Sequence, residues 1–295
     1  MNEVNNDCHG KGVLYLVATP IGNLGDISPR AVEILKKADI IAAEDTRVTA
    51  GLLSHLGIRK SAVSYHEHNK EESGRRILER LQLGDDCALV CDAGTPGISD
   101  PGEALVLLCA QNGIDVISIP GPCAAVSALV ISALPTRRFS FEGFLPSQKK
   151  DREAKLKILK EEERTFIIYE APHKLKNTLE ELQLTLGSDR KISVCREMTK
   201  IHEEIIRTTL GEAVSYYTSN EPRGEFVLVI EGAPESEKNS SVNAVTDELE
   251  DILVTLESLI ASGRSLSDAS KIVSRITGLS KNTVYSAYIE NSRRQ

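Results

Sequence analysis

The sequence has 295 residues, a formal net charge of −8 and six cysteines. At about 100 to 200 residues per domain, this length predicts at least two domains with ample core. The net negative charge disfavours a protein that binds nucleic acid over its whole surface. The cysteines lie mostly in apolar runs, without the spacing of a disulfide framework or a metal site, and this indicates a reducing cytoplasm.

Neither the N-terminal stretch nor the longest uncharged window has a pattern typical of a secreted or membrane protein. Stretch 1–11 is polar, which predicts disorder, and it lacks the apolar core of a signal peptide. The longest uncharged window, 116–136, is interrupted by Pro-Gly-Pro, so it predicts a buried strand and helix rather than a membrane span. We therefore expect a cytoplasmic protein without membrane contact.

The first predicted unit is a strand, a glycine loop and a helix. The apolar run 13–18 predicts a strand that leads into the loop 19–26. Ser28 is a typical helix cap, with Pro29 at the first helical position and an end near Lys37. The loop is longer than the two to six residues usual for a plain connection, and this favours a ligand-binding loop.

The next two units are shorter. A strand at 40–43 ends in Glu-Asp-Thr-Arg, and a helix follows to His55. The charged cluster has two equal interpretations, a substrate contact through Arg47 or a local ion pair. A strand at 62–65 precedes a helix ending near Leu83. His66 and His68 have the spacing of a metal pair, but no further ligand cluster accompanies them, so we expect solvated loop residues and no metal.

The stretch 86–135 contains two apolar runs, each followed by a Gly/Pro-rich loop and a helix. The strands at 87–91 and 115–119 are expected to be buried on both faces of a parallel sheet. Asp100 is predicted to cap the first helix, with Pro101 at its first position. The loops then lie at the carboxyl edge of the sheet, where such folds bind ligands. Neither contains Lys or Arg, which favours a ligand that is not strongly anionic.

The pattern restarts after Pro135. Strands are predicted at 139–144, 165–169, 191–195, 204–208 and 226–230, with helices at 151–163 and up to Leu186. Between residues 137 and 160, eight basic residues outnumber three acidic ones, for a net charge of +5. This segment is either a phosphate-binding face or an ordinary solvated helix.

The C-terminal part changes composition. Segment 235–261 has a net charge of −6 and segment 262–295 a net charge of +4. Helices are predicted at 266–277 and 281–292, with the spacing of a helix-turn-helix. Such a pair either touches nucleic acid or packs on its own chain. The predicted organisation is disordered 1–11, an N-terminal α/β domain 12–134, a second α/β domain 135–234, a linker 235–246 and a helical module 247–295.

Eight motifs, in this order, carry a resemblance to a known family: ATPIGNLGDIS, AEDTR, DAGTPGISDPG, IPGPCAAVSAL, FEGFLP, YEAPHK, REMTK and RGEFVLVIEG. The chain resembles the small-subunit ribosomal RNA methyltransferases of the tetrapyrrole methylase superfamily. The resemblance implies two α/β/α domains with S-adenosylmethionine in the cleft between them, and a helix-turn-helix-like tail. It also implies a homodimer that methylates the 2′-hydroxyl of a cytidine in the decoding centre of 16S rRNA, within the small ribosomal subunit.

The resemblance also assigns cofactor loops. Gly94-Thr95-Pro96 stands at the superfamily's Gly-Asp-Pro loop, and its threonine argues against a tetrapyrrole substrate. Cys123 stands where such enzymes often have serine, so a hydroxyl contact is not expected there. The cofactor-binding residues implied are Thr19, Pro20, Gly22, Asp92, Gly94, Thr95, Pro96, Ile98, Ser99, Gly121, Pro122, Cys123, Ala124, Ala125 and Tyr169.

A ribose hydroxyl is a weak nucleophile and benefits from a base. The candidates near strand ends are Asp100, Glu170, His173 and Glu197, of which Glu170 with His173 is preferred. Catalysis by alignment, with proton loss to water, stays open. The cations that are candidates for RNA phosphates are Arg47, Lys174, Arg196 and Lys200.

Two other classes of protein remain as alternatives. A methyltransferase for a small tetrapyrrole would share the fold and cofactor but would not need the basic segment or the tail. A non-catalytic ribosome-associated protein would need both of these but not the intact glycine loops.

Overall fold

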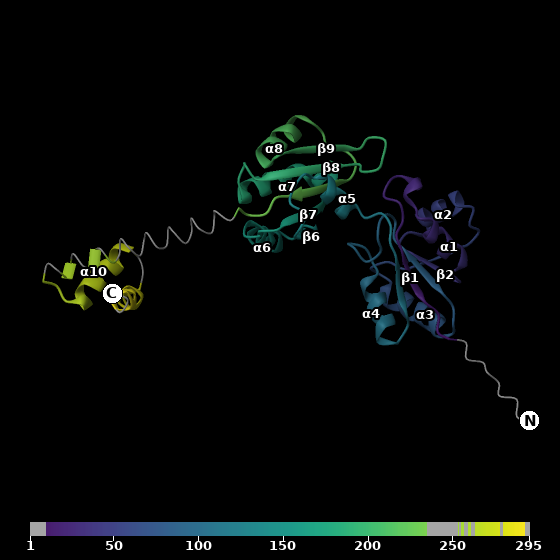
Figure 1. Cartoon of the computed structure of the whole chain (residues 1–295), viewed down its shortest axis with the longest axis horizontal. Coiled ribbons are helices and arrows are strands. Elements are labelled where there is room, and N and C mark those ends of the chain that lie inside the picture. Colours follow the sequence, from purple (N-terminus) through teal and green to yellow (C-terminus); the bar gives the residue numbers. More distant parts are fainter. Residues whose placement is uncertain are drawn as a thin grey trace, which may run out of the picture. The chain divides into compact units, whose positions relative to one another are not determined.

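A computed structural model describes residues 10–234, residues 253, 255, 256, 259 and 260, and residues 263–277 and 280–292. Two compact units result, one up to Gly232 and one from Ala233 onward (Figure 1). Most of the predicted disordered N-terminus and the whole predicted linker lie outside the described residues. Lys11, predicted to be disordered, instead donates from its Nζ to the carbonyl of Asn112 at 2.8 Å. None of the described helices is long and apolar enough to cross a membrane.

The first sheet has five parallel strands in the order β3-β2-β4-β1-β5. Its strands are β1 (Leu14–Val17), β2 (Ile40–Ala43), β3 (Ala62–Ser64), β4 (Cys87–Val90) and β5 (Val116–Ile119). Helices α1 (Pro29–Lys37) and α2 (Thr46–His55) pack on one face, and α3 (Lys70–Gln82) and α4 (Glu103–Gln111) pack on the other. The Ser28 side chain caps α1 by accepting from the Ala31 N–H, as predicted.

The second sheet is mixed, in the order β6-β7-β10-β8-β9, and only β6 and β7 are parallel. Its strands are β6 (Phe139–Phe144), β7 (Thr165–Glu170), β8 (Lys191–Arg196), β9 (Glu204–Thr209) and β10 (Phe226–Ile230). The helices α6 (Lys149–Lys160), α7 (Pro172–Leu186) and α8 (Leu210–Ser219) cover one face. Every residue of β10 is buried, because β10 lies at the centre of the sheet.

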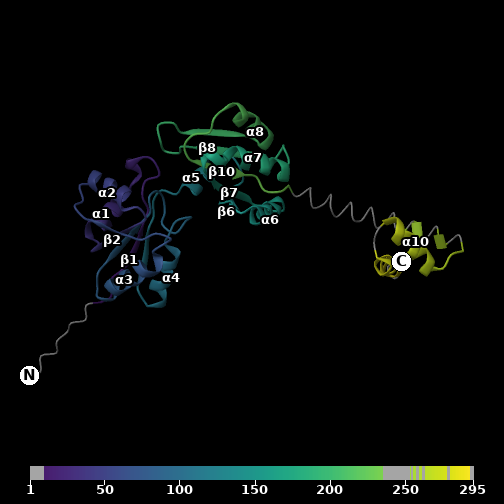
Figure 2. The same cartoon turned by 180° about the vertical axis from the view of Figure 1, so that it is seen from behind.

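The other face of the second sheet is covered by α5 (Ala124–Ile131), which follows β5 of the first sheet. Ala125, Ala128 and Leu129 pack against Ile167 and Val229, and both views show α5 beside the second sheet (Figures 1 and 2). The chain therefore changes sheets within the loop 120–123, ahead of the boundary that the sequence predicts after residue 134. The apolar pattern of α5 identifies a buried helix but not the sheet that buries it.

Three expectations are wrong in detail. Asp100 does not cap α4, because this helix begins at Glu103 with Gly102 as its cap. Strand β5 is not buried on both faces, because it is an edge strand with Ile117 partly exposed. Helix α6 begins and ends earlier than predicted, at Lys149 and Lys160. Helix α8 was missed, although Thr209 and Glu212 form a capping box at its start.

The second unit contains α10 (Leu266–Thr277) and α11 (Lys281–Ser292), the two helices predicted for the tail. Leu256, Ala269, Val273 and Val284 form a small buried cluster between them and the preceding helical residues. The Lys281 ammonium bonds the Ser267 hydroxyl at 2.9 Å. The predicted helical pair is thus present.

Candidate active site

Three loops are joined at the carboxyl edge of the first sheet. Thr19 and Gly94 exchange backbone hydrogen bonds of 2.8 and 3.1 Å, which join the loops after β1 and β4. The Thr95 hydroxyl donates to the Pro122 carbonyl at 3.0 Å and so joins the loop after β5. A Cβ at Gly121 would lie 2.9 Å from the Cβ of Ala18. These contacts hold the three loops in one fixed arrangement, as a ligand cradle requires.

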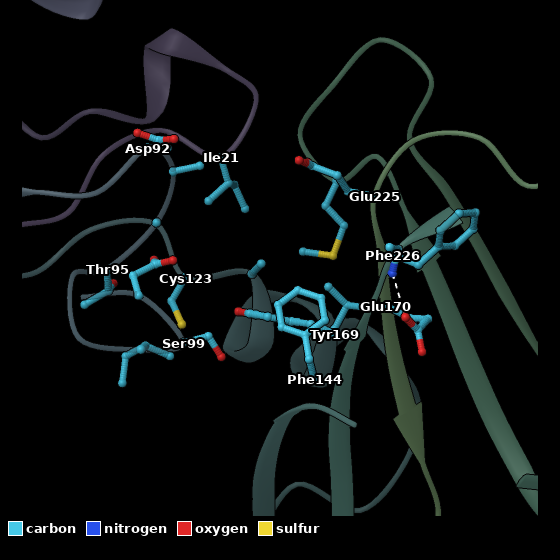
Figure 3. A pocket seen from close by; sticks show the side chains of 18 of the residues that line it. Ile21, Asp92, Thr95, Ser99, Cys123, Phe144, Tyr169, Glu170, Glu225 and Phe226 are labelled. Carbon is cyan, nitrogen blue, oxygen red and sulfur yellow. Dashed lines mark hydrogen bonds between the residues drawn. The ribbon is translucent and has the colours of Figure 1, made fainter. Parts of the chain in front are cut away.

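A pocket of about 440 Å³ lies between these loops and the second sheet (Figure 3). Such a volume is typical of sites for small molecules and cofactors. The first domain supplies three carboxylates and two hydroxyls together with small and apolar residues, and the second supplies mostly apolar side chains. The lining residues are Ile21, Glu44, Asp92, Ala93, Gly94, Thr95, Ile98, Ser99, Asp100, Cys123, Ala124, Phe144, Tyr169, Glu170, Ala171, Pro172, Cys195, Met198, Glu225, Phe226 and Val227.

Three carboxylates share the polar side of the pocket. Burial, followed by the charges of Asp100 and Asp92, raises the pKa of Glu44. Burial, together with the charge of Asp92, also raises the pKa of Asp100. The Asp92 carboxylate accepts from the Asp45 N–H at 3.0 Å, which fixes its position. This acidic cluster of Glu44, Asp92 and Asp100 favours a cationic ligand group and opposes an anionic one.

Tyr169 connects the second sheet to the third loop. Its Oη accepts from the Ala125 N–H at 3.1 Å. Burial raises the pKa of Tyr169 to about 12, so the hydroxyl stays neutral. Phe144 packs edge-on against the tyrosine ring at 5.7 Å between centroids. Together with Met198 and Val227, these two rings form the apolar wall of the pocket, which suits a ligand that must be held away from water.

The chain matches the family described as Tetrapyrrole (Corrin/Porphyrin) Methylases over residues 13–214. This protein belongs to the tetrapyrrole methylase family. Among its relatives, "Ribosomal RNA small subunit methyltransferase I" of Synechocystis sp. is 50% identical over 280 residues, covering 95% of this chain and 98% of that one. The protein of the same name from Halalkalibacterium halodurans is 49% identical, with 94% and 95% covered.

Solved structures give the same fold. Diphthine synthase superposes with a TM-score of 0.57 at 16% identity, covering 75% of this chain and 90% of that one. Uroporphyrin-III C-methyltransferase from Thermus thermophilus, complexed with S-adenosylhomocysteine, gives a TM-score of 0.52 at 21% identity, with 75% and 97% covered. The expected tetrapyrrole methylase fold is thereby confirmed.

About half of the family's expected cofactor residues line the pocket directly. They are Asp92, Gly94, Thr95, Ile98, Ser99, Cys123, Ala124 and Tyr169. The other seven do not line it and belong to the same three loops or to the start of α5: Thr19, Pro20, Gly22, Pro96, Gly121, Pro122 and Ala125. Gly22 lines a different pocket, beside Thr199 and Lys200. Thr19, for example, is 1% exposed, and its hydroxyl donates to the Cys91 carbonyl at 3.2 Å.

The expected pair of Glu170 and His173 does not form in this pocket. Glu170 is 4% exposed, and both of its carboxylate oxygens are engaged. One accepts from the Ala171 N–H at 2.8 Å (Figure 3). The other accepts from the Thr178 hydroxyl at 2.6 Å. His173 lines a different pocket. Asp100 does not cap α4, and it is the one of the four candidate bases whose carboxyl belongs to the acidic cluster.

Three of the four cations expected to hold RNA phosphates are in ion pairs. Arg47 contacts Asp45 at 2.6 Å, so the local ion pair is present in the charged cluster after β2. Arg196 pairs with a carboxylate of β9 at 2.9 Å. Lys200 bridges two carboxylates, each at 2.8 Å, and those carboxylates belong to Glu197 and Glu225. Lys174 lines the same second pocket as His173.

Several lining residues were missed in the sequence. Glu44 directly follows a strand, in the charged cluster that the sequence interprets either as a substrate contact or as a local ion pair. It was not among the residues predicted for the site. Met198 lies in the turn after β8, Glu225 directly before β10 and Val227 within β10. Their apolar or charged character alone gave no sign of a site. His66 and His68 contact each other edge-on, and no group of three or more metal-ligating side chains occurs among the described residues.

Proposed function

We propose that this protein transfers a methyl group from S-adenosylmethionine to the 2′-hydroxyl of a cytidine in the decoding centre of 16S rRNA. The observation that carries the proposal is the pocket of about 440 Å³, with a glycine cradle and an acidic cluster on one side and an apolar wall on the other. Near-full-length relatives named as ribosomal RNA small subunit methyltransferases support the RNA as acceptor.

The pocket fits the cofactor in shape and charge. Gly94 has φ +95°, a conformation that a side chain strains, so its backbone is free to approach a ligand. The acidic cluster favours a sulfonium and an ammonium group, both of which are cationic. The cofactor, when bound, supplies an electrophilic methyl group. We assign its contacts to the eight expected residues that line the pocket, with the other seven as their support.

The chain's own residues have two tasks in this reaction. They must remove one proton from the acceptor hydroxyl, and they must keep water from the reacting atoms. We assign the first task to Asp100, because its raised pKa makes it a better base than an ordinary aspartate. The apolar wall of Met198, Val227 and Phe144 performs the second task. Glu170 instead holds the turn between β7 and α7 in place.

A tetrapyrrole acceptor is less compatible with this pocket. Such molecules carry several carboxylates, and the acidic cluster would repel them. In an RNA acceptor only the neutral ribose hydroxyl needs to reach the reacting position, while the phosphates stay outside. A purely RNA-binding protein would not need an enclosed pocket with joined glycine loops.

We also propose that the protein acts as a homodimer in the cytoplasm, where ribosomal subunits are assembled. Helix α5 is apolar on all sides, and its outer face leaves Val126 48% and Val130 67% exposed. Edge strand β5 leaves Ile117 36% exposed. Exposed apolar groups of this kind are typical of subunit contacts. Sedimentation of the full chain tests this proposal, and a monomer at micromolar concentration would contradict it.

The reaction is tested by transfer of labelled methyl from S-adenosylmethionine to small ribosomal subunits from cells that lack this protein. Naked 16S rRNA and a tetrapyrrole precursor serve as parallel acceptors. We expect label in the subunit, at a single alkali-resistant ribose linkage. Label only in the tetrapyrrole would favour the small-molecule alternative. Cofactor binding without label in any RNA would refute the proposed acceptor.

A further inference from the structure

A second pocket, of about 430 Å³, lies between α6 and the first turns of α7. Its lining includes the cations Lys149, Arg152 and Lys174, together with His173. The carboxylates in the lining are Glu153 and Glu181. Cations thus outnumber carboxylates here, whereas the methyl-transfer pocket carries the acidic cluster. This polarity favours an anionic ligand for the second pocket.

Arg152 is held at the base of this pocket with spare hydrogen-bonding capacity. Its Nε donates to Glu181 at 2.6 Å, and its Nη2 donates to the Thr178 hydroxyl at 2.7 Å. Its Nη1 reaches the Pro146 carbonyl at 3.5 Å. A guanidinium has five N–H groups, so two of them remain for another acceptor. The side chain is only 12% exposed, and its position is therefore already fixed before a ligand binds.

Lys149 and Lys174, the exposed cations at the rim, are neutralised less than Arg152. Lys174 makes no ion pair with any carboxylate of the described residues. Lys149 reaches Glu153 only at 3.9 Å, with both side chains mostly exposed, so water screens this pair strongly. The pocket therefore offers two weakly held ammonium groups above a fixed guanidinium.

The second pocket adjoins the methyl-transfer pocket along the chain. Ala171 and Pro172 line the first pocket, and the next two residues, His173 and Lys174, line the second. Glu170 of the first pocket is joined to Arg152 of the second through the Thr178 hydroxyl. The two pockets are thus linked both by the start of α7 and by this chain of hydrogen bonds.

We propose that this second pocket binds a backbone phosphate of the substrate RNA next to the methylated nucleotide. The inference rests on the proposed function and deepens it. The acidic cluster repels phosphate from the reacting pocket, so the negative charge next to the target ribose needs a cationic site outside it. Arg152 receives the phosphate oxygens, and Lys149 and Lys174 supply charge from the rim. The site positions the RNA and takes no part in the chemical step.

The test compares the KM for small ribosomal subunits among K174Q, E153Q and the control K37Q over a range of salt concentrations. Lys37 is exposed in the last turn of α1, on the other domain. K174Q should raise the KM about tenfold without changing kcat, because a charge-assisted contact is lost. It should also flatten the slope of log KM against log salt by about 0.7, the value for one phosphate of single-stranded RNA.

The variant E153Q should change the KM in the opposite direction to K174Q. Removal of this carboxylate leaves more positive charge in the pocket, so the KM should fall by about threefold. A purely structural role for these residues would not tighten binding. Suppose that the wild type transfers methyl to the subunit, but K174Q and K37Q have the same KM and the same salt slope. That result would overturn the phosphate site and leave the proposed function standing. No methyl transfer to any RNA by the wild type would overturn the proposed function, and the phosphate site with it.

Discussion

The substitution D100N tests whether Asp100 is the base of the reaction, apart from the charge that the acidic cluster offers to the cofactor. Asn keeps the size and one oxygen of Asp100 but cannot accept a proton from the acceptor hydroxyl. A positioned general base contributes about 10²- to 10⁴-fold in rate, or about 2.7 to 5.5 kcal/mol. Glu44 and Asp92 line the same pocket and can partly replace the lost base. We therefore expect a loss near the lower limit, about 10²-fold in kcat.

The pH dependence has a defined sign. Because burial raises the pKa of Asp100 in the folded protein, the wild-type rate should fall on acidification at a higher pH than for an ordinary aspartate. D100N should lose this limb of the profile. A raised folded-state pKa means that stability is lost as the pH rises through that pKa. D100N should therefore raise the Tm at about pH 8, and the gain should shrink as the pH falls.

The assay is single-turnover methyl transfer at saturating cofactor, with calorimetry for the methylated and the demethylated cofactor. D100N should weaken the binding of the cationic methylated cofactor more than the binding of the neutral demethylated cofactor. The matched control is E225Q, which removes the same charge at a side chain 78% exposed on the opposite side of the pocket. A D100N rate within twofold of the wild type would refute Asp100 as the base and leave proton loss to water.

Three further outcomes are expected. T178V should lower the free energy of unfolding by about 3 kcal/mol, because Glu170 and the partly buried Arg152 each lose a charged hydrogen bond, and a normal Tm would contradict that network. The control for T178V is T178S, which keeps the hydroxyl. G121V should weaken cofactor binding by moving its loop away from Ala18, and unchanged calorimetry would contradict the cradle. Deletion of 233–295 should weaken binding to the small subunit but not to the cofactor, and equal subunit affinity would exclude the tail as a contact.

The elements of this protein could be predicted closely from local patterns. Strand β10, the helical pair of the tail and the Ser28 cap were each placed correctly, because their signals lie within a few consecutive residues. Helix α8 was missed because its amphipathic pattern follows directly on edge strand β9. The glycine loops were also found by sequence, since Gly and Pro at strand ends mark a ligand edge.

The direction of individual side chains could not be predicted in the same way. Glu170 stands at a strand end beside the pocket, and its sequence position resembles that of a base. Only the fold places Thr178, two helical turns later, where its hydroxyl holds that carboxylate. Asp100 had the local signature of a helix cap, yet α4 begins at Glu103. Local sequence patterns indicate which residues lie near the carboxyl edge of a sheet. They do not indicate which hydrogen-bond or charge partners those residues have in the fold.

The sequence by itself determined the family, the two α/β domains and the three loops at the strand ends, because each depends on short-range pattern. The tertiary structure alone decided that α5 crosses to the second sheet, that Glu44 joins Asp92 and Asp100, and that His173 lies in a separate pocket. The physical reason is that charge repulsion and burial act through space. The charge of Asp100 raises the pKa of Glu44 only after β2 and β4 pair in the sheet.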